Sequence, residues 1–478
     1  MYNHYITIYQ AQPHDSDLEH TTRIYMPKQI ESMKPMPTKF SIKTLGCKVN
    51  QFESDAIARE LSRADWVQVE KCESADLCII NTCAVTGKAS MQSRQAVRQA
   101  IRANPQAEIV VTGCYAQTAP DELRTISGVH AVVGQVEKSQ IPDLIGKGGC
   151  RDCGIDTPKR PVRQKSIEPA IGYGRRSRPF LKIQDGCDAF CTYCIVPYAR
   201  GSSRSLSAED AISGIRQLKA AGYHEVVLTG IHLGCYGLDL TPPCDLLTLL
   251  KKIRDSRAID RVRLSSIEPH ELSPELIEFI ADSGSGRGRI CPHFHIPLQS
   301  GDDGILKKMH RPYTRQYFKE LVLAICEQIA GVAIGVDILV GFPGESTAAF
   351  ERTYALIAEL PVAYLHVFPF SARRGTPAYR FSDPVPRQTI RDRARRLREL
   401  GKAKKYDYYH KFVGKTVELV VEKKSDTVSG YSKGTSSNYI PILVKGTCTA
   451  VNTLVKVQIK QVDSHLNVFG GVNGNYKK

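Results

Sequence analysis

At 478 residues the chain is too long for one ordinary hydrophobic core, and we expect about three domains. Its 42% hydrophobic and 24% charged residues are typical of a globular protein, and no apolar run approaches the roughly 20 residues that span a bilayer, which excludes an integral membrane protein. The 65 Lys and Arg against 49 Asp and Glu give a net charge of +16, which favours a polyanionic partner such as RNA or DNA over a merely solubilising surface.

The chain contains 15 cysteines. A secreted, disulfide-rich protein is disfavoured because this number is odd, the chain is long and no signal peptide opens it. We therefore expect a cytoplasmic protein with reduced thiols, some of which bind metal.

The first 145 residues are predicted to form an extension and one domain. Residues 1–38 show no sustained hydrophobic period and are interpreted as a disordered extension. From 39 to 145, the runs FSIKTLGC, DLCIINTC and EIVVTGC predict buried parallel strands with amphipathic helices between them, which indicates an open α/β sheet. The three strands end in Cys47, Cys83 and Cys114. Because the carboxyl ends of parallel strands share one edge of a sheet, we expect these thiols to converge.

The rest of the chain is predicted to contain a linker and two further domains. Residues 146–178 are rich in Gly, Pro and Arg and predict a basic linker. Between 179 and 411, six strand-like runs alternate with helical patterns, which predicts a partial (β/α)6 barrel that ends in a strongly basic helix from 386. Short alternating segments in 412–478 predict a small antiparallel β-barrel, a fold that often binds nucleic acid.

The segment DGCDAFCTYCIVPYARG carries Cys187, Cys191 and Cys194 in CxxxCxxC spacing. Three thiolates in so short a loop can hold one metal centre, but they leave one position of a 4Fe-4S cluster or a zinc ion open. No histidine lies between Cys187 and Gly201, so an ordinary structural zinc loop would need a distant fourth ligand. An open metal position can bind a cofactor or a substrate.

This loop resembles the cluster-binding loop of the radical S-adenosylmethionine (SAM) superfamily. The resemblance implies that SAM chelates the fourth iron of a 4Fe-4S cluster and is cleaved to a 5′-deoxyadenosyl radical. It also implies that Tyr193 contacts the adenine of SAM. The strand-end segments LTGIHLG, HIPLQSG and GVDILVGFPGE resemble further SAM-contacting segments, and the positions implied there are Thr229, Gly230, Gln299, Ser300, Val340 and Gly341.

The other three cysteines resemble a second cluster site. LGCKVNQFES, NTCAVTGKAS and VTGCYAQ are similar to the auxiliary-cluster domain of the methylthiotransferases, and this resemblance extends from about residue 39 into a TRAM-like C-terminal barrel. Within that family the motifs are most similar to the MtaB type, which acts on threonylcarbamoyladenosine in tRNA. The resemblance implies a second 4Fe-4S cluster on Cys47, Cys83 and Cys114. Without it, three widely spaced cysteines are more often buried thiols than ligands.

The implied reaction replaces the adenine C2 hydrogen of N6-threonylcarbamoyladenosine, at position 37 beside the anticodon of tRNA, with a methylthio group, and uses two SAM molecules per turnover. The implied partners are tRNA, an electron donor of the flavodoxin or ferredoxin type and a sulfur donor. We expect a monomer with no membrane association. Contacts with the RNA backbone are expected from cations of the basic helix, namely Arg391, Arg395, Arg396, Lys404 and Lys405.

Two alternatives to this reaction remain open. The same chemistry could act on isopentenyl-adenosine in tRNA or on an aspartate of a ribosomal protein, and a different class of protein, a non-catalytic zinc-containing RNA-binding protein, would use its cysteines only to stabilise folds. Cys235 departs from the family pattern and is interpreted as a reduced structural thiol, as are Cys72 and Cys78.

Overall fold

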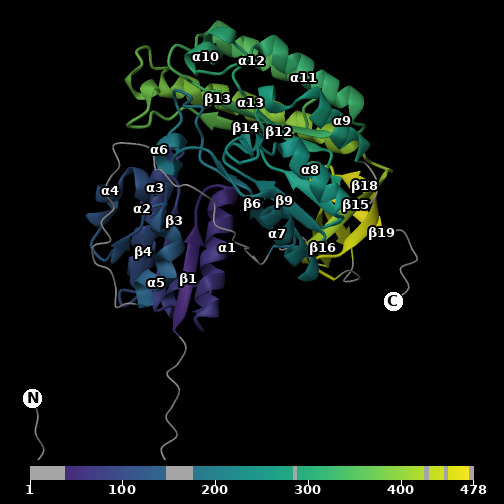
Figure 1. Cartoon of the computed structure of the whole chain (residues 1–478). Coiled ribbons are helices and arrows are strands. Elements are labelled where there is room, and N and C mark those ends of the chain that lie inside the picture. Colours follow the sequence, from purple (N-terminus) through teal and green to yellow (C-terminus); the bar gives the residue numbers. More distant parts are fainter. Residues whose placement is uncertain (1–37, 147–175, 284–287, 425–429, 446–449, 473–478) are drawn as a thin grey trace, which may run out of the picture. The chain divides into compact units, whose positions relative to one another are not determined.

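The computed structural model describes residues 38–146, 176–283, 288–424, 430–445 and 450–472 (Figure 1). Nearly all of the predicted extension and most of the predicted linker, residues 1–37 and 147–175, lie outside this part of the chain. Within it, no helix is both long and apolar enough to cross a membrane.

The N-terminal domain is a five-stranded parallel sheet with the order β2-β1-β3-β4-β5. The strands are β1 (Lys39–Thr44), β2 (Val67–Gln68), β3 (Leu77–Thr82), β4 (Glu108–Gly113) and β5 (Ala131–Val132). The three predicted strands are β1, β3 and β4. The sequence analysis missed β2 and β5 because two residues are too few to show a period.

Helices cover both faces of this sheet because its strands alternate in the side chains they present to each face. Leu77 and Ile79 pack in one apolar cluster with Ile57 of α1 (Lys48–Arg63), whereas Cys78 and Ile80 pack with α2 (Gly87–Ala103). Figure 1 shows α1 and α2 on opposite sides of β1 and β3. The remaining helices of the domain are α3 (Cys114–Thr118), α4 (Pro120–Arg124) and α5 (Ile141–Gly146).

A disulfide links Cys72 to Cys78, with 5.8 Å between their Cα atoms. This corrects the expectation that both thiols are unpaired. Cys72 lies in a short 3₁₀ turn, Cys72–Ser74, directly before β3, and the chain there brings it within bonding reach of the strand. Sequence spacing alone does not reveal that approach.

The central domain is an open barrel of parallel strands, as predicted. Its strands are β6 (Phe180–Lys182), β9 (Glu225–Thr229), β10 (Arg261–Leu264), β12 (His293–Gln299), β13 (Ala333–Val340) and β14 (Tyr364–Pro369). Strands β6, β9 and β10 pair in one sheet and β12, β13 and β14 in another, and a parallel bridge between Ser266 and His295 joins the two sheets. No pairing closes the barrel between β6 and β14 among the described residues.

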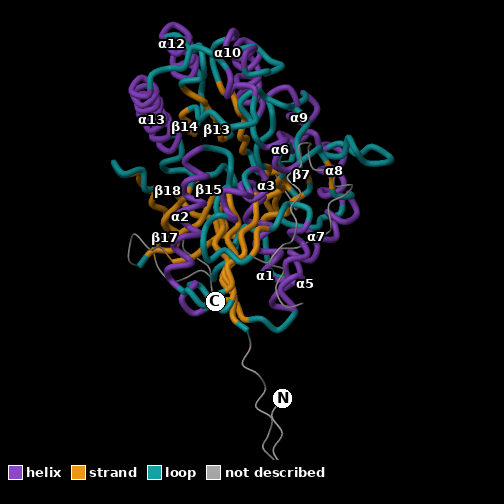
Figure 2. Tube along the Cα trace, turned by 90° about the vertical axis from the view of Figure 1, so that its left-hand side faces the viewer, coloured by secondary structure: helices purple, strands orange, loops and turns teal. Residues whose placement is uncertain are grey.

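Helices cover the outer face of the barrel. They are α7 (Ala208–Ala220), α8 (Leu246–Asp255), α9 (Pro274–Asp282), α10 (Asp303–Lys308), α11 (Arg315–Gln328), α12 (Thr347–Glu359) and the predicted basic helix α13 (Arg387–His410). Figure 2 shows α12 and α13 outside β13 and β14. Short elements complete the domain, namely β7 (Gln184–Asp185), α6 (Val196–Arg200), β8 (Arg204–Ser205) and β11 (Arg289–Ile290).

The barrel strands present apolar side chains to the helices and polar ones to the inner face. Val226, Val262 and Val336 belong to the large core that includes residues of α7, α8 and α12. Alternation along each strand places the neighbouring residues on the opposite face. The inner face therefore carries Glu225, Arg261, Arg263, His293, His295, Asp337, Tyr364 and His366.

The C-terminal domain is a closed five-stranded barrel with the order β15-β16-β17-β19-β18. Its strands are β15 (Thr416–Lys424), β16 (Tyr431–Ser436), β17 (Pro441–Lys445), β18 (Leu454–Val462) and β19 (Val468–Val472). The predicted small barrel is confirmed, and its pairs are antiparallel except β17 with β19, which is parallel. Arg261 and Arg263 attach it to the central domain, because both pair with Glu225 and also donate to backbone carbonyls of residues 435–437.

Candidate active site

The CxxxCxxC loop lies between β7 and α6, at the carboxyl end of the first barrel strand. Cys191 is buried, whereas Cys187 and Cys194 are half-buried, and all three are free thiols. Cys194 N donates to Cys191 O at 2.9 Å, which bends the loop into a turn. Burial raises the pKa of the Cys194 thiol to about 12, and the charges of Cys191 and Cys187 act in the same direction. The three sulfur atoms therefore influence one another, as ligands of one metal centre must.

Gly186 sets the backbone that starts this loop. Its φ is +77°, and a Cβ atom there would lie 2.0 Å from Ser202 O. Gly186→Ala is therefore expected to lower the free energy of unfolding by about 2–4 kcal/mol, since it combines left-handed strain with a backbone clash. Thermal unfolding and iron content per chain after reconstitution measure the effect.

Gly222 offers a matched control for that substitution. Its φ is +88°, but nothing lies within 4 Å of the added Cβ. Gly222→Ala is expected to cost only about 1 kcal/mol and to leave the iron content unchanged. Equal stabilities and equal iron contents for the two variants would contradict the role given to Gly186.

The second triad converges at the carboxyl edge of the N-terminal sheet, as predicted. Cys47, Cys83 and Cys114 directly follow or lie near the ends of β1, β3 and β4, which are neighbours in the sheet. A Cβ atom on Gly46 would lie 3.0 Å from Cys83 Sγ, so the turn that carries Cys47 rests against Cys83. Burial, together with the charges of Cys114 and Cys47, raises the pKa of the Cys83 thiol to about 12.

A buried network of charges connects the surroundings of the two triads. Arg200 is 1% exposed and is the last residue of α6, the helix after the CxxxCxxC loop, which is called the radical loop below for its resemblance to radical SAM loops. Its Nη1 atom donates to Glu53 Oε1 and Asp185 Oδ1, both at 2.9 Å. Its Nη2 atom donates to Asn50 Oδ1 at 2.6 Å. Asn50 and Glu53 lie on the first turns of α1, directly after Cys47. The network thus ties residues beside Cys47 to residues on both sides of the radical loop.

Lys138 extends this network on the N-terminal side. Its Nζ atom is 2.6 Å from Glu53 Oε2. Burial alone would raise the pKa of Glu53, but Arg200, Lys138 and Lys182 together hold it well below its ordinary value. Arg200 and Lys138 also act electrostatically on the buried thiol of Cys114, opposing the rise in its pKa that burial causes. Fixed positive charge therefore lies beside the second triad, which favours thiolate ligands.

The predicted SAM-contacting residues fall into two groups. Tyr193, within the CxxxCxxC loop itself, packs against a cluster that includes Met309 and Phe342. Thr229 is buried at the end of β9, and a Cβ atom on Gly230 would lie 2.8 Å from Gln184 Oε1, so the chain passes close to β7 there. These three residues lie in the loop and at the strand ends around it.

The other four predicted residues are committed largely to the protein interior. Val340 is fully buried in the large core, and a Cβ atom on Gly341 would lie 2.3 Å from Ile390. Their backbone is engaged as well, because Gly341 N donates to Glu345 Oε2 and Phe370 N donates to Val340 O, both at 2.8 Å. Ser300 is buried, and its hydroxyl lies 3.4 Å from that of Thr353. Gln299 has a φ of +67° at a shift in register between β12 and β13.

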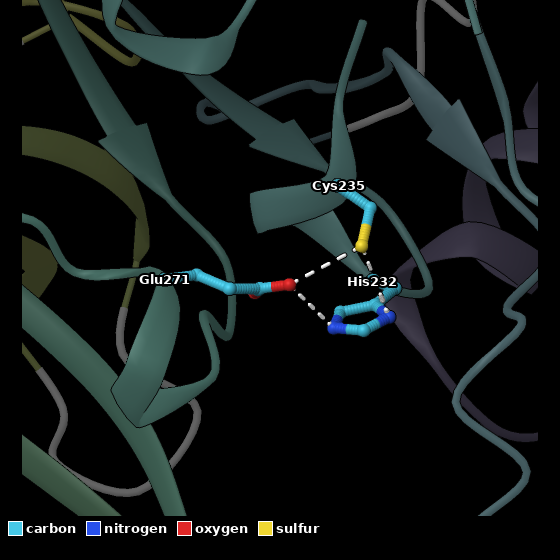
Figure 3. A group of neighbouring side chains, drawn as sticks. All are labelled: His232, Cys235 and Glu271. Atoms are coloured by element: carbon cyan, nitrogen blue, oxygen red, sulfur yellow. Dashed lines mark hydrogen bonds and ion pairs between the residues drawn. The ribbon is translucent and has the colours of Figure 1, made fainter. Parts of the chain in front are cut away.

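A cluster that the sequence analysis missed lies beside Cys187. His232 Nδ1 is 3.4 Å from Cys187 Sγ. The same atom is 3.5 Å from Cys235 Sγ, and His232 Nε2 is 2.7 Å from Glu271 Oε1 (Figure 3). Cys235, expected to be a reduced structural thiol, is a free thiol that also contacts this cluster. On the other side of the loop, Arg311 donates to Cys191 Sγ at 3.2 Å. No local sequence motif marked His232 or Arg311, because both reach the cysteines only through tertiary contacts.

Comparison with known proteins shows which family has this arrangement. Residues 39–134 match the uncharacterized protein family UPF0004, and residues 181–357 match the radical SAM superfamily. The threonylcarbamoyladenosine tRNA methylthiotransferase MtaB of Bacillus subtilis (strain 168) is 38% identical over 422 residues, which cover 87% of this chain and 92% of that protein. The protein of the same name from Aquifex aeolicus (strain VF5) is 37% identical, and the match covers 88% of this chain and 100% of that protein. This chain belongs to the radical SAM tRNA methylthiotransferases.

Other members and a more distant structure fit the same assignment. A tRNA-2-methylthio-N(6)-dimethylallyladenosine synthase of Clostridium botulinum (strain Hall / ATCC 3502 / NCTC 13319 / Type A) is 32% identical, covering 89% of this chain and 95% of its own. The solved structure of the radical SAM methyltransferase TsrM from Kitasatospora setae has a TM-score of 0.51 at 14% identity, covering 91% of this chain and 87% of that one, and shows a shared fold. Membership of the radical SAM superfamily implies a 4Fe-4S cluster and SAM.

The cations predicted to contact RNA differ in how far this methylthiotransferase leaves them free. Arg391 and Arg395 are exposed on α13, and Arg395 pairs with Asp392 of the same helix at 2.9 Å. Arg396 pairs with Glu351 at 2.6 Å, and Lys404 donates to the carbonyl of Leu360 at 2.7 Å. Lys405 is half-buried, with its Nζ atom 5.5 Å from the centre of the Tyr409 ring. Arg396 and Lys404 therefore hold α13 to α12 and to the residue that follows α12.

Proposed function

We propose that this enzyme converts N6-threonylcarbamoyladenosine at position 37 of tRNA into its 2-methylthio derivative. The observation that carries the proposal is the pair of thiol triads, each at the carboxyl edge of a parallel sheet and joined through the Arg200 network. The names of the 36–38% identical relatives support this substrate, since all five of them are threonylcarbamoyladenosine tRNA methylthiotransferases.

The residues present suit two iron-sulfur clusters. Cys187, Cys191 and Cys194 would hold the cluster that binds SAM, and Cys47, Cys83 and Cys114 would hold an auxiliary cluster. Each set supplies three thiols, and three ligands leave one iron of a 4Fe-4S cluster open. When bound, the first cluster with SAM would supply the radical that removes the adenine C2 hydrogen, and the auxiliary cluster would supply the sulfur that replaces it.

The protein residues orient the reacting parts. Arg200, Glu53 and Asp185 fix the radical loop against the start of α1, and the packing of Ile195 and Ala199 with Tyr115 joins α6 to α3 in one apolar cluster. Rigid elements hold a reactive geometry more accurately than loops do. We further propose a cytoplasmic monomer with no membrane association that is reduced by a flavodoxin-type or ferredoxin-type donor, takes sulfur from a separate donor, and binds tRNA through Arg391, Arg395 and a TRAM-like C-terminal barrel.

Mass spectrometry of tRNA nucleosides tests this function. Cells lacking the gene are expected to lose only the methylthio-threonylcarbamoyl nucleoside and to accumulate its unmethylthiolated precursor, and a plasmid copy should restore it. Loss of a methylthio-isopentenyl nucleoside instead would transfer the assignment to the reaction named for the Clostridium relative. An unchanged nucleoside profile, together with stoichiometric zinc in place of iron, would support the non-catalytic RNA-binding alternative.

A further inference from the structure

A cavity of about 460 Å³ lies where three parts of the chain meet. Its wall includes the first residue of α1, the first residue of β6, the middle of β9, the inner face of β10, and the C-terminal barrel. The lining residues are Lys48, Arg176, Ser177, Arg178, Phe180, Val227, Arg263, Glu422 and Tyr439. None of the predicted cluster or SAM positions is among them. The cavity therefore lies apart from the predicted SAM positions, but it adjoins the second triad through Lys48, which directly follows Cys47 in the chain.

The cavity is rich in positive charge. Its wall carries four cations and one carboxylate, and Arg178 neutralises that carboxylate, Glu422, at 2.8 Å. Arg263 already donates hydrogen bonds to Glu225 and to the backbone carbonyls of Ser436 and Ser437. Arg176 lies 3.5 Å from Asp55. Among the cations of this wall, these pairs leave one without an ion-pair partner in the described part of the chain.

That cation is Lys48. It is half-buried, and its ammonium group makes no hydrogen bond or ion pair within the described part of the chain. Arg176, Arg178 and Arg263 line the same cavity wall. A cation partly removed from water among other cations is costly unless an anion joins it. The wall is thus complementary to a compact anionic group.

The aromatic residues in the wall do not suit a nucleobase. The guanidinium group of Arg176 lies 5.2 Å from the centre of the Phe180 ring, and that of Arg263 lies 5.3 Å from the centre of the Tyr439 ring. His293 stacks on Tyr439 at 4.2 Å. Stacking of a base needs an open ring face, and Tyr439 already has Arg263 and His293 as partners, while Phe180 has Arg176 on one face. A carboxylate or a phosphate fits the wall better than a base does.

We propose that this cavity binds the carboxylate of the threonylcarbamoyl substituent, with Lys48 as its binding residue. This inference rests on the proposed function. Lys48 directly follows Cys47, which would hold the auxiliary cluster, so the cavity adjoins the proposed reaction site and is placed to take an anionic group of the reacting nucleotide. An isopentenyl substituent carries no charge, so the cavity would also select between the two adenosine substrates.

The test compares three anticodon stem-loop RNAs with the reconstituted holoenzyme. One carries threonylcarbamoyladenosine, one its carboxylate methyl ester, and one isopentenyl-adenosine. Wild-type kcat/KM is expected to be about 10- to 100-fold higher for the acid than for the ester, the range of a charge-assisted hydrogen bond. Lys48→Gln is expected to remove most of this preference. The loss of kcat/KM caused by Lys48→Gln and the loss caused by the ester should therefore not be additive. Fluorescence anisotropy of RNA binding without reductant gives a readout independent of turnover.

Controls separate this inference from other causes. Lys43→Gln removes an exposed lysine of β1 that contacts only the side chain of Gln99, and it should keep the wild-type preference. Lys48→Arg should also keep it, because the charge remains. Equal kcat/KM values of the wild-type enzyme for the acid and the ester would overturn the proposal, even if Lys48→Gln failed to fold. Equal weakening of all three RNAs by Lys48→Gln would instead assign Lys48 to a phosphate. Wild-type activity on the isopentenyl RNA alone would refute the proposed function itself.

Discussion

Cys191→Ala and Cys114→Ala are expected to abolish the methylthiolated product while separating the two triads by a second readout. Cys191→Ala should also stop formation of 5′-deoxyadenosine, because its loop would hold the cluster that binds SAM. Cys114→Ala should retain this SAM cleavage. Both losses of product should exceed about 100-fold, which is more than the removal of a contact behind a ligand costs. Each variant should bind about four irons per chain, against about eight in the wild type.

Cys326→Ala is the matched control for these ligand substitutions. Cys326 is half-buried and packs against the large core. The variant should keep both readouts and the full iron content. If Cys114→Ala abolished SAM cleavage as completely as Cys191→Ala, the separate assignments of the two triads would fail.

The convergence of the cysteines could be predicted because it follows from local patterns and one topological rule. Short strand-like segments rich in Ile, Val and Phe marked β1, β3 and β4, and the carboxyl ends of parallel strands share one edge of a sheet. The partial barrel followed from the same period of strand and helix. In both domains the sequence carried the signal in segments short enough for periodicity to reveal.

Contacts between distant segments could not be predicted in this way. Asn50, Asp185 and Arg200 come from two domains, and no sequence period relates them. Net charge also did not show which cations stay free: Arg391 is exposed, whereas Lys404 is used to hold α12. The cavity beside Lys48 exists only because the C-terminal barrel packs against β10.

Arg200→Met is expected to lower the free energy of unfolding by about 3–5 kcal/mol, because it leaves buried carboxylates without their main partner. Glu53 and Asp185 are buried, and Arg200 reaches both at 2.9 Å. The product formed per SAM cleaved should also fall, since the network sets the radical loop against the auxiliary triad. Chemical denaturation and the ratio of methylthiolated nucleoside to 5′-deoxyadenosine measure the two effects.

The pH dependence of this loss identifies its cause. Arg200 and its neighbours hold the pKa of Glu53 well below its ordinary 4.5, so the network stabilises the fold fully above that pH and loses its contribution as pH falls toward the lowered value. The difference in stability between wild type and Arg200→Met should therefore shrink below about pH 4.5. Arg63→Met, which breaks an exposed pair with Glu60, should cost less than about 1 kcal/mol at any pH. Adding Glu53→Gln to Arg200→Met should recover part of the loss, since it removes a stranded charge. A loss for Arg200→Met no larger than that for Arg63→Met would show that the network does not join the two domains energetically.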